Sequence, residues 1–243
     1  QDLIRKITKD VNIIFHLAAL ISIPYSYVSP RSYISTNIIG TLNLLEALKN
    51  SNIELFVNTS TSEVYGSAQY SPIDEEHPLN AQSPYAATKI SADQLCLSYY
   101  RSFELPISVI RPFNTFGPRQ SLRAAIPTII TQALKKEKSI KMGNTSTKRD
   151  FSYVSDTVSG FTSCIGNKKS IGEVINLGTG VAFTIAETIE YISELTNIEI
   201  KVEVDKTRLR PQKSEVNHLL SKNDKAKEIL NWQPKFANKE GFK

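Results

Sequence analysis

Short apolar runs alternate with longer helical segments in the first half of this chain, and this alternation constrains the fold more than any other feature. Runs rich in β-branched and aromatic residues at 12–19 (NIIFHLAA), 53–58 (IELFVN) and 106–112 (PISVIRP) predict three buried strands. Between them, 31–50 and 84–103 have the apolar spacing and the length of helices. Strand, long helix and strand in succession is typical of a parallel sheet with crossover helices.

The second half of the chain has shorter elements and denser charge. The expected elements are a helix at 124–137, a less regular region at 141–154, a helix from about 155, a strand at 173–177, a helix from about 184 and a strand at 201–204. We therefore predict an α/β protein with a sheet domain in residues 1–118. A smaller α/β lobe occupies 119–243, with some of its chain returning to the sheet.

The composition is that of an ordinary globular protein, with 40% hydrophobic and 22% charged residues among 243. No apolar run approaches the roughly 18 residues of a spanning helix, so we expect no membrane partner. Cys96 and Cys164 stand far apart in non-motif surroundings, which favours a reducing cytoplasm over a disulfide framework. His77 and His218 lack ligand spacing, so no metal site is expected. The net charge of +5 favours anionic partners without choosing among them.

The stretch SPYAATK at 83–89 places a tyrosine and a lysine on one helical face. Ser83 suits the N-cap and Pro84 the first helical position, so Tyr85 and Lys89 fall four residues apart. A phenol has a pKa of about 10, and lowering it to about 7 requires roughly 4 kcal/mol. An ammonium at about 4 Å and an effective dielectric of about 20 supplies that order of energy. With 10 tyrosines, about one such pair arises by chance, so a surface Tyr and Lys is the alternative.

A second polar stretch, TSTSEVYG at 59–66, follows the strand expected at 53–58. Small hydroxyl residues in such a run usually form a turn. Ligands in parallel sheets, however, lie at the carboxyl ends of strands. Because the Tyr85 helix begins about twenty residues later, we expect Glu63 to share a cleft with Tyr85 and Lys89.

Six motifs in order resemble the extended short-chain dehydrogenase/reductase family, which contains nucleotide-sugar epimerases and dehydratases. They are HLAA (16–19), TNIIGT (36–41), STSEVYG (60–66), SPYAATK (83–89), RPFNTFGPR (111–119) and RDFSYVSD (149–156). The resemblance implies a Rossmann-like, doubly wound sheet that binds NAD in residues 1–118. It also implies a lobe that binds a nucleoside-diphosphate sugar in 119–243.

Within this family the residues after the strand select the reaction. Thr61, Ser62 and Glu63 resemble the triplet of GDP-mannose 4,6-dehydratases and depart from the Thr-Asp-Glu of dTDP-glucose dehydratases. The resemblance implies that Tyr85, helped by Lys89 and NAD⁺, takes the 4-hydroxyl proton during C4 oxidation, with Thr61 holding the 4-oxygen. Glu63 then removes the C5 proton, water leaves from C6, and the hydride returns to C6. A water relayed through Ser62, or Glu63 itself, protonates the leaving hydroxyl.

The resemblance also assigns binding residues. The cofactor residues are Leu17, Ala18, Ala19, Asn37, Thr59, Ser60, Tyr85, Lys89, Pro112 and Phe113. The substrate residues are Thr61, Asn114, Arg119, Arg149 and Arg210, and Arg123 is considered beside Arg119. Arginine suits phosphate through its fork of donors. The alternatives are solvated surface charges for Arg149 and Arg210, a core histidine for His16 and a helix-surface asparagine for Asn37.

Several activities remain open from the sequence. The stretches 19–30 and 114–130 resemble dehydratases of the legionaminic-acid type pathway, which implies a nucleotide-linked N-acetylglucosamine and bacterial surface-sugar synthesis. UDP-glucuronate decarboxylase and nucleotide-sugar 4-epimerase are rivals of the same fold; the decarboxylase needs an extra cation for the sugar carboxylate. A nucleic-acid-binding module is the rival from another class. The basic run 135–149 motivates it, but that run lacks aromatic interleaving, so we expect no nucleic-acid partner.

Two expectations concern assembly and cofactor affinity. By resemblance, the helices at 31–50 and 84–103 pair with a second subunit to form a homodimer. The Gly-rich turn that seats a dinucleotide is absent from these residues, which implies a missing N-terminal part and poor NAD binding by this chain alone. Neither NAD over NADP nor GDP over UDP can be read from the sequence.

Overall fold

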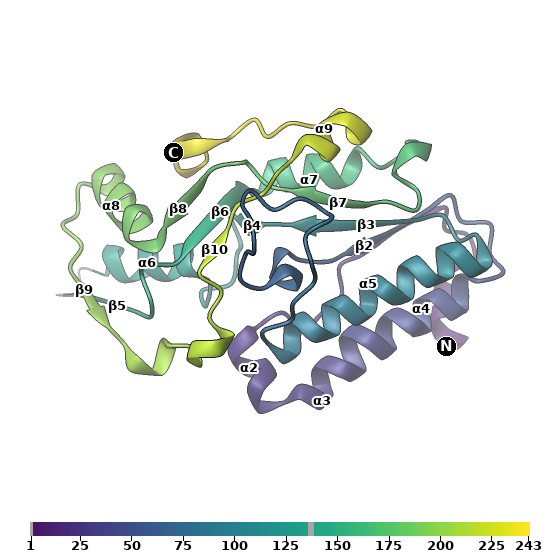
Figure 1. The fold of residues 1–243 in the computed structure, drawn as a ribbon, viewed down its shortest axis with the longest axis horizontal. Helices are drawn as coiled ribbons and strands as arrows, with labels where there is room; N and C mark the ends of the chain where they lie inside the picture. Colours follow the sequence, from purple (N-terminus) through teal and green to yellow (C-terminus); the bar gives the residue numbers. More distant parts are fainter. Residues whose placement is uncertain (1, 136–138) are drawn as a thin grey trace.

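The first sheet of the computed structural model, which describes residues 2–135 and 139–243, has four parallel strands (Figure 1). Their order is β1 (Ile13–His16), β2 (Leu55–Thr59), β3 (Ile107–Pro112) and β7 (Val174–Leu177). The register aligns their carboxyl ends at one edge, which is where parallel sheets bind ligands. The three strands expected in the first half and the returning strand at 173–177 are confirmed.

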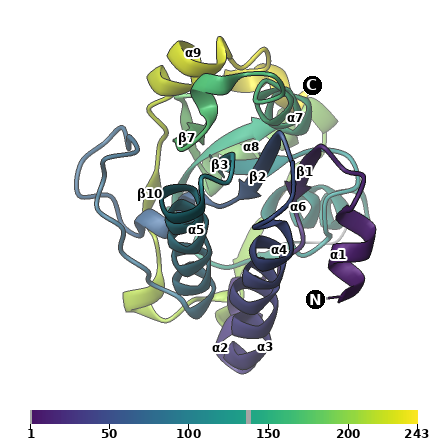
Figure 2. The ribbon, with the colours of Figure 1, turned by 90° about the vertical axis from the view of Figure 1, so that its right-hand side faces the viewer.

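Helices cover both faces of this sheet (Figures 1 and 2). One face carries α4 (Gly40–Leu48) and α5 (Pro84–Phe103), with α1 (Asp2–Thr8) against α4. The other face carries α7 (Val154–Thr162) and α9 (Asp224–Leu230). Alternate residues of one strand therefore enter different cores, which is why the strands read as continuous apolar runs. Phe56 packs with the first pair, and Leu55 and Val57 pack with the second. The doubly wound, Rossmann-like fold is confirmed.

The helix expected at 31–50 is made of several pieces. It begins with α3 (Pro30–Tyr33), continues through a π-helical segment (Ile34–Ile39) and ends as α4. A short helix, α2 (Ile23–Val28), precedes it. The π-helical segment buries Asn37, which is 1% exposed.

A second sheet forms beside the carboxyl edge of the first (Figure 1). Its parallel order is β10 (His218–Leu219), β6 (Lys148–Tyr153) and β4 (Asn114–Phe116), and β8 (Ala182–Thr184) pairs antiparallel with β6. The expectation of a less regular region at 141–154 is therefore wrong. Charged residues interrupt the apolar pattern that would predict β6 from the sequence. Asp150 is nevertheless fully buried, because the backbone N–H groups of Thr179, Gly180 and Ser221 donate to its carboxylate.

The remaining lobe packs two helices beside the second sheet. α6 (Ala125–Leu134) and α8 (Ile185–Thr196) share one apolar core, and α8 starts with a capping box between Thr184 and Glu187. β5 (Ile140–Met142) pairs in parallel with β9 (Val202–Val204). The helices expected from about 124, 155 and 184 and the strand at 201–204 are confirmed, while positions 136–138 of the first lie outside the described residues. Short 3₁₀ turns complete the chain at Ser62–Tyr65, Lys168–Ser170, Lys206–Arg208, Gln212–Ser214 and Asn238–Phe242.

Two features of the described residues concern a membrane and a metal ion as partners. Within residues 2–135 and 139–243, no helix has the length and apolarity to cross a membrane. Over the same residues, no three His, Cys, Asp or Glu side chains gather as metal ligands would.

Candidate active site

A polar turn follows β2 at the carboxyl edge of the first sheet. Thr61 caps the 3₁₀ turn Ser62–Tyr65, and its side chain accepts a hydrogen bond from the backbone N–H of Glu63 at 3.3 Å. The turn ends at Gly66, whose φ of 62° lies in the left-handed region. A Cβ at this position would lie 2.2 Å from the carbonyl oxygen of Asn80, so only glycine closes the turn here.

Helix α5 presents a line of ionisable side chains to this turn. Ser83 caps the helix by accepting from the backbone N–H of Ala86 at 3.1 Å, as expected. Tyr85, Lys89 and Asp93 follow at four-residue steps, and all three are buried, at 7%, 4% and 0% exposure. Buried polar groups at this spacing require partners on the neighbouring element.

The turn and the helix meet through direct hydrogen bonds. The ammonium of Lys89 donates to the carbonyl oxygen of Thr59 at 2.5 Å. The side chains of Thr61 and Glu63 both lie near enough to the phenol of Tyr85 to shift its pKa. The shared location of Tyr85, Lys89, Thr61 and Glu63, which the sequence predicts, is therefore seen.

Burial dominates the titration of Tyr85. Burial raises the pKa of Tyr85; the Thr61 hydrogen bond lowers it, while Glu63, Asp93 and Tyr33 raise it further. Burial also lowers the pKa of Lys89. That Lys89 and the positive charge of NAD⁺ together make Tyr85 a working base stays a prediction, because burial outweighs the protein's own groups here and the Lys89 ammonium donates to Thr59. A phenolate at neutral pH requires a further positive charge beside Tyr85.

Glu63 also belongs to a group of four charged side chains, here called the open charge cluster. Its members are Glu63, Arg149, Arg210 and Glu215. Arg210 Nη1 lies 3.8 Å from Glu63 Oε1 and 3.9 Å from Glu215 Oε1, and Arg149 Nη2 lies 3.9 Å from the same Glu215 oxygen. The side chains of Arg210 and Glu63 are 24% and 12% exposed. The sequence predicted Arg149, Arg210 and Glu63 as site residues but missed Glu215.

The segment that carries Arg210 and Glu215 is tied to the sheet domain. The Ser214 hydroxyl donates to the carbonyl oxygen of Gln82, so the Tyr27 hydroxyl, 2.6 Å from Ser214 Oγ, is the donor in that second contact. These bonds join the segment to α2 and to the residues just before α5. The open charge cluster is thereby held against the Ser62–Tyr65 turn.

The residues expected to back the cofactor lie along the same carboxyl edge. Asn37 is not on a helix surface: it accepts from the backbone N–H of Leu20 at 2.9 Å and donates to the Leu20 carbonyl and to Thr88 Oγ1, both at 3.0 Å. It thus fixes the loop after β1, where Leu17 is 66% exposed and Ala18 and Ala19 are at least partly exposed. Thr59, Ser60, Pro112 and Phe113 follow the neighbouring strands β2 and β3.

Two buried oxygens at this edge suit a polar ligand. Thr59 Oγ1 and Asn114 Oδ1 have no hydrogen-bond partner among residues 2–135 and 139–243. A buried polar atom left without a partner costs about 1–3 kcal/mol. Thr59 ends β2 and Asn114 follows β3, so both oxygens lie at the carboxyl edge, where a polar ligand could supply the missing partners.

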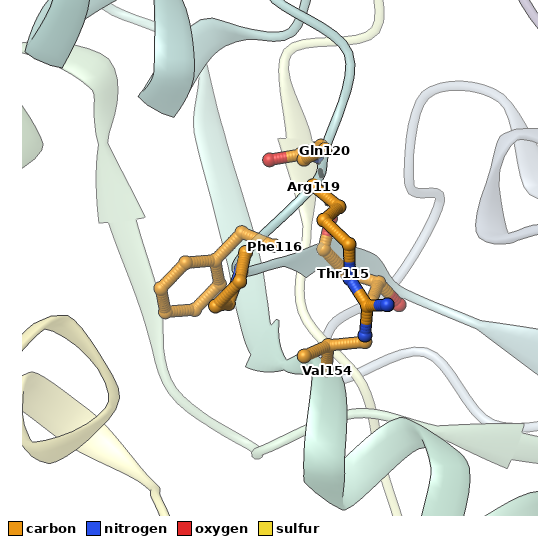
Figure 3. A pocket seen from close by; sticks show the side chains of 7 residues that line it. Thr115, Phe116, Arg119, Gln120 and Val154 are labelled. Carbon is orange, nitrogen blue, oxygen red and sulfur yellow. Dashed lines mark hydrogen bonds between the residues drawn. The ribbon is translucent and has the colours of Figure 1, made fainter.

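Arg119 lies elsewhere. It is exposed and has a φ of 68°. Its side chain lines a small cavity of about 220 Å³ together with Thr115, Phe116, Gln120 and Val154 (Figure 3). The structure gives Arg119 no contact with the open charge cluster, so its assignment to substrate stays a prediction.

The parallel sheet, with a Tyr-x-x-x-Lys helix against hydroxyls at a strand end, defines a protein of the short-chain dehydrogenase/reductase class. The family model for GDP-mannose 4,6 dehydratase matches residues 1–243, and the chain belongs to this family. It is 35% identical over 240 residues to a UDP-glucuronate 4-epimerase of Thermodesulfobacterium geofontis, covering 97% of this chain and 72% of that protein.

Solved structures agree with this assignment. The UDP-glucuronic acid 4-epimerase of Bacillus cereus, in complex with UDP-glucuronic acid and NAD, is similar with a TM-score of 0.91 and 30% identity, covering 98% of this chain and 75% of that one. The dTDP-glucose 4,6-dehydratase of Bacillus anthracis, in complex with NAD, is similar with a TM-score of 0.87 and 31% identity over 99% and 73%. The resemblance to nucleotide-sugar epimerases and dehydratases is confirmed, and the legionaminic-acid type match stays a prediction.

Proposed function

We propose that this protein is an NAD-dependent nucleotide-sugar 4,6-dehydratase acting on a nucleoside-diphosphate N-acetylhexosamine. The observation that carries the proposal is the carboxylate of Glu63 in the turn capped by Thr61, near enough to the buried Tyr85 to shift the pKa of its phenol. A 4-epimerase needs no second base at this position, whereas water elimination requires a carboxylate that removes a proton next to the oxidised carbon.

The carboxyl edge of the first sheet holds the cofactor in this proposal. The loop after β1 at 17–19, Thr59, Ser60, Lys89 and the Pro112–Phe113 pair would contact NAD. The cofactor, when bound, accepts a hydride from sugar C4 and later returns it to C6. The positive charge of NAD⁺ would lower the pKa of Tyr85, because a nearby cation stabilises the phenolate form of a buried phenol.

The protein's own groups move the protons. Tyr85 takes the proton of the sugar 4-hydroxyl, and Thr61 holds the 4-oxygen. The resulting 4-ketone makes the C5 proton acidic, and Glu63 removes it while the C6 hydroxyl leaves as water. Ser62 is only 3% exposed, so Glu63, which is half-buried, is better placed to hand its proton to the leaving hydroxyl.

The open charge cluster binds the diphosphate in this proposal. Arg149 and Arg210 supply charged donors, and Asn114 supplies a buried amide at the same edge. Arginine forms paired hydrogen bonds to phosphate oxygens, which fixes the sugar as well as binding it. The sugar ring is then positioned between these cations and Tyr85.

One observation favours a second candidate, an enzyme acting on UDP-glucuronate as 4-epimerase or decarboxylase. Such a substrate carries a carboxylate on the sugar and needs a cation near the reacting carbons. Arg210 lies 3.8 Å from Glu63, close enough to the catalytic turn to serve as that cation. The two proposals therefore differ in whether Arg210 meets the diphosphate or the sugar carboxylate.

Product analysis by mass spectrometry, with chromatographic separation of the C4 epimers, distinguishes these reactions. The full-length protein with NAD is incubated with UDP- and GDP-N-acetylglucosamine and with UDP-glucuronate. Loss of water from an N-acetylglucosamine nucleotide supports the dehydratase. Loss of carbon dioxide from UDP-glucuronate, or inversion without a mass change, supports the second candidate and contradicts the first.

The Glu63→Gln variant tests the role of the carboxylate. We expect it to bind the sugar nucleotide and oxidise C4, seen as reduced nicotinamide, while water loss stops. Glu215→Gln is the matched control, because it neutralises another carboxylate of the open charge cluster without touching the Tyr85–Thr61 pair. Unimpaired dehydration by Glu63→Gln would eliminate this role.

We also propose that the protein works as a cytoplasmic homodimer in surface-polysaccharide synthesis. The apolar side chains of Ile34 and Ile39 are 46% and 44% exposed beside α4, which supports pairing of this helical face with a second copy. Light scattering of the full-length protein tests it. A monomeric mass at micromolar concentration contradicts the dimer.

A further inference from the structure

An ion pair lies buried beneath the catalytic turn, and the proposed reaction does not use it. Arg111 Nε donates to Asp93 Oδ2 at 3.2 Å, and the two side chains are 3% and 0% exposed. Asp93 comes four residues after Lys89 on the face of α5 that carries Tyr85. Arg111 is the one charged residue of β3, a buried strand of sequence ISVIRP.

Asp93 holds the residues that lead into the turn. Asn58 Nδ2 donates to Asp93 Oδ1 at 3.1 Å, and Ser60 Oγ donates to Asp93 Oδ2 at 2.7 Å. The carbonyl oxygen of Thr59, between them, accepts from Lys89. Helix α5 is therefore bonded to three consecutive residues immediately before Thr61.

Arg111 holds the other end of the turn. Its Nη1 donates to the hydroxyl of Tyr65 at 3.0 Å, and its guanidinium lies 5.0 Å from the centre of the Tyr65 ring. Burial raises the pKa of Tyr65 to about 12, so the phenol stays neutral and donates its own proton to Asn176 Oδ1 at 2.7 Å. Asn176 lies on β7, so the end of the turn is bonded to two strands.

Both ends of the turn therefore connect to one ion pair. Ser60 reaches it through Asp93, and Tyr65 reaches it through Arg111. Asn58 Oδ1 has no hydrogen-bond partner among the described residues, but the Asp93 and Arg111 side chains are bonded from several directions. Buried side-chain bonds of this kind restrict the arrangement of the groups that they join. The groups joined here are the helix with Tyr85 and Lys89 and the turn with Thr61 and Glu63.

We propose that Asp93 and Arg111 are positioning residues that set where Thr61 and Glu63 lie relative to Tyr85 and Lys89. The proposal rests on the proposed function only in taking these four groups as catalytic. It holds for a dehydratase, a decarboxylase or an epimerase alike, because each needs C4 oxidised at Tyr85. A displacement of about 1 Å between catalytic groups can cost about 100-fold in rate.

Two variants test the proposal from opposite ends of the network. Asp93→Asn places an amide where Ser60 and Arg111 donate. Tyr65→Phe keeps the ring but removes the hydroxyl that joins the turn to Arg111 and Asn176, and it is the milder change should Asp93→Asn fail to fold. The controls are Asp156→Asn, a buried carboxylate on α7 that accepts from the backbone N–H of Phe236, and Tyr70→Phe, which removes a phenol bonded to Asp74 on the surface.

The readouts separate positioning from simple loss of stability. We expect both test variants to lower kcat by about tenfold or more with KM for the sugar nucleotide unchanged, because distorted geometry weakens the transition state more than ground-state binding. We also expect faster hydrogen exchange at the backbone amides of residues 63–66 in the folded protein. The controls change neither quantity, although Asp156→Asn lowers the unfolding temperature.

Three results decide the matter. Test variants that match the controls in kcat and in exchange at residues 63–66 overturn the proposal, as does a fall in kcat/KM that comes entirely from KM. If the unaltered protein turns over none of the sugar nucleotides, the proposed function fails, and the exchange measurement alone still decides the positioning role.

Discussion

Two arginine–carboxylate groupings flank the Ser62–Tyr65 turn, and they are built differently. Beneath the turn, Arg111 and Asp93 lie 3.2 Å apart with 3% and 0% of their side chains exposed. Above it, Arg210 lies 3.8 Å from Glu63 with 24% and 12% exposed. Asp93 and Arg111 are hydrogen-bonded to each other and to neighbouring side chains. The ion-pair contacts of the open charge cluster are too long to be hydrogen bonds.

This difference indicates different tasks. The Asp93 carboxylate accepts from Asn58, Ser60 and Arg111, so its bonding capacity is taken up within the protein. The Nη1 atom of Arg210 is buried and has no hydrogen-bond partner among the described residues. A charged donor that lacks an acceptor is suited to receive one from a ligand. We therefore expect the buried pair to hold geometry and the open charge cluster to offer donors to an anion.

The largest effect that we predict contrasts the stability of the two groupings. Arg111→Met leaves the Asp93 carboxylate buried without its cation, and we expect a loss of about 3–5 kcal/mol in the free energy of unfolding. Arg210→Met breaks only long, partly solvated contacts, and we expect a change below about 1 kcal/mol. Urea unfolding of the two variants beside the unaltered protein measures both. Equal losses in the two variants would show that the groupings do not differ as their geometry implies.

The first sheet is readable from the sequence because its strands are buried on both faces and give continuous apolar runs. β6 is not readable, because Lys148, Arg149 and Asp150 lie in it and their partners come from distant segments. Asp150, for example, is satisfied by the backbone near Thr179 and Ser221. The short strands β8 and β10 give no periodic signal, having only three and two residues. Elements satisfied by long-range bonds are thus the ones that local pattern misses.

The site follows the same rule. The meeting of Thr61 and Glu63 with Tyr85 and Lys89 could be predicted, because a strand end and a helix start are local signals. Asp93 and Arg111 were missed, although an aspartate one turn beyond Lys89 and an arginine inside an apolar strand were visible as anomalies. The raised pKa of Tyr85 was also missed, because desolvation depends on packing that the sequence does not display.

Another buried group of the sheet domain, His16, predicts a pH response of stability. His16 Nε2 lies 3.0 Å from Thr41 Oγ1, and that hydroxyl gives its own proton to the Asn37 carbonyl, so Nε2 is the donor to Thr41. Burial, and secondarily Lys89, lowers the pKa of His16 from 6.5 to about 4. Because the folded-state pKa lies below the unfolded value, the stabilisation is present above pH 6.5 and is lost as the pH falls toward 4. The loss amounts to about 3 kcal/mol.

The His16→Gln variant isolates this contribution. Glutamine keeps an amide donor for Thr41 and does not titrate, so the difference in unfolding free energy between variant and unaltered protein should change with pH between 6.5 and 4 and be constant above it. Denaturant titrations at several pH values measure the difference. A difference that stays constant down to pH 4 would rule out a buried, neutral His16.

The smallest predicted effect concerns the open charge cluster and ligand affinity. Because Arg210 has free donors and adds little to stability, Arg210→Met should weaken binding of UDP or GDP by about tenfold, the worth of one charged hydrogen bond. Arg208→Met is the matched control, since Arg208 lies two residues away and pairs with Asp205 on the surface. Calorimetry on the full-length protein measures the affinities. Unchanged affinity in Arg210→Met, with weaker binding of UDP-glucuronate alone, would instead assign Arg210 to a sugar carboxylate and favour the second candidate function.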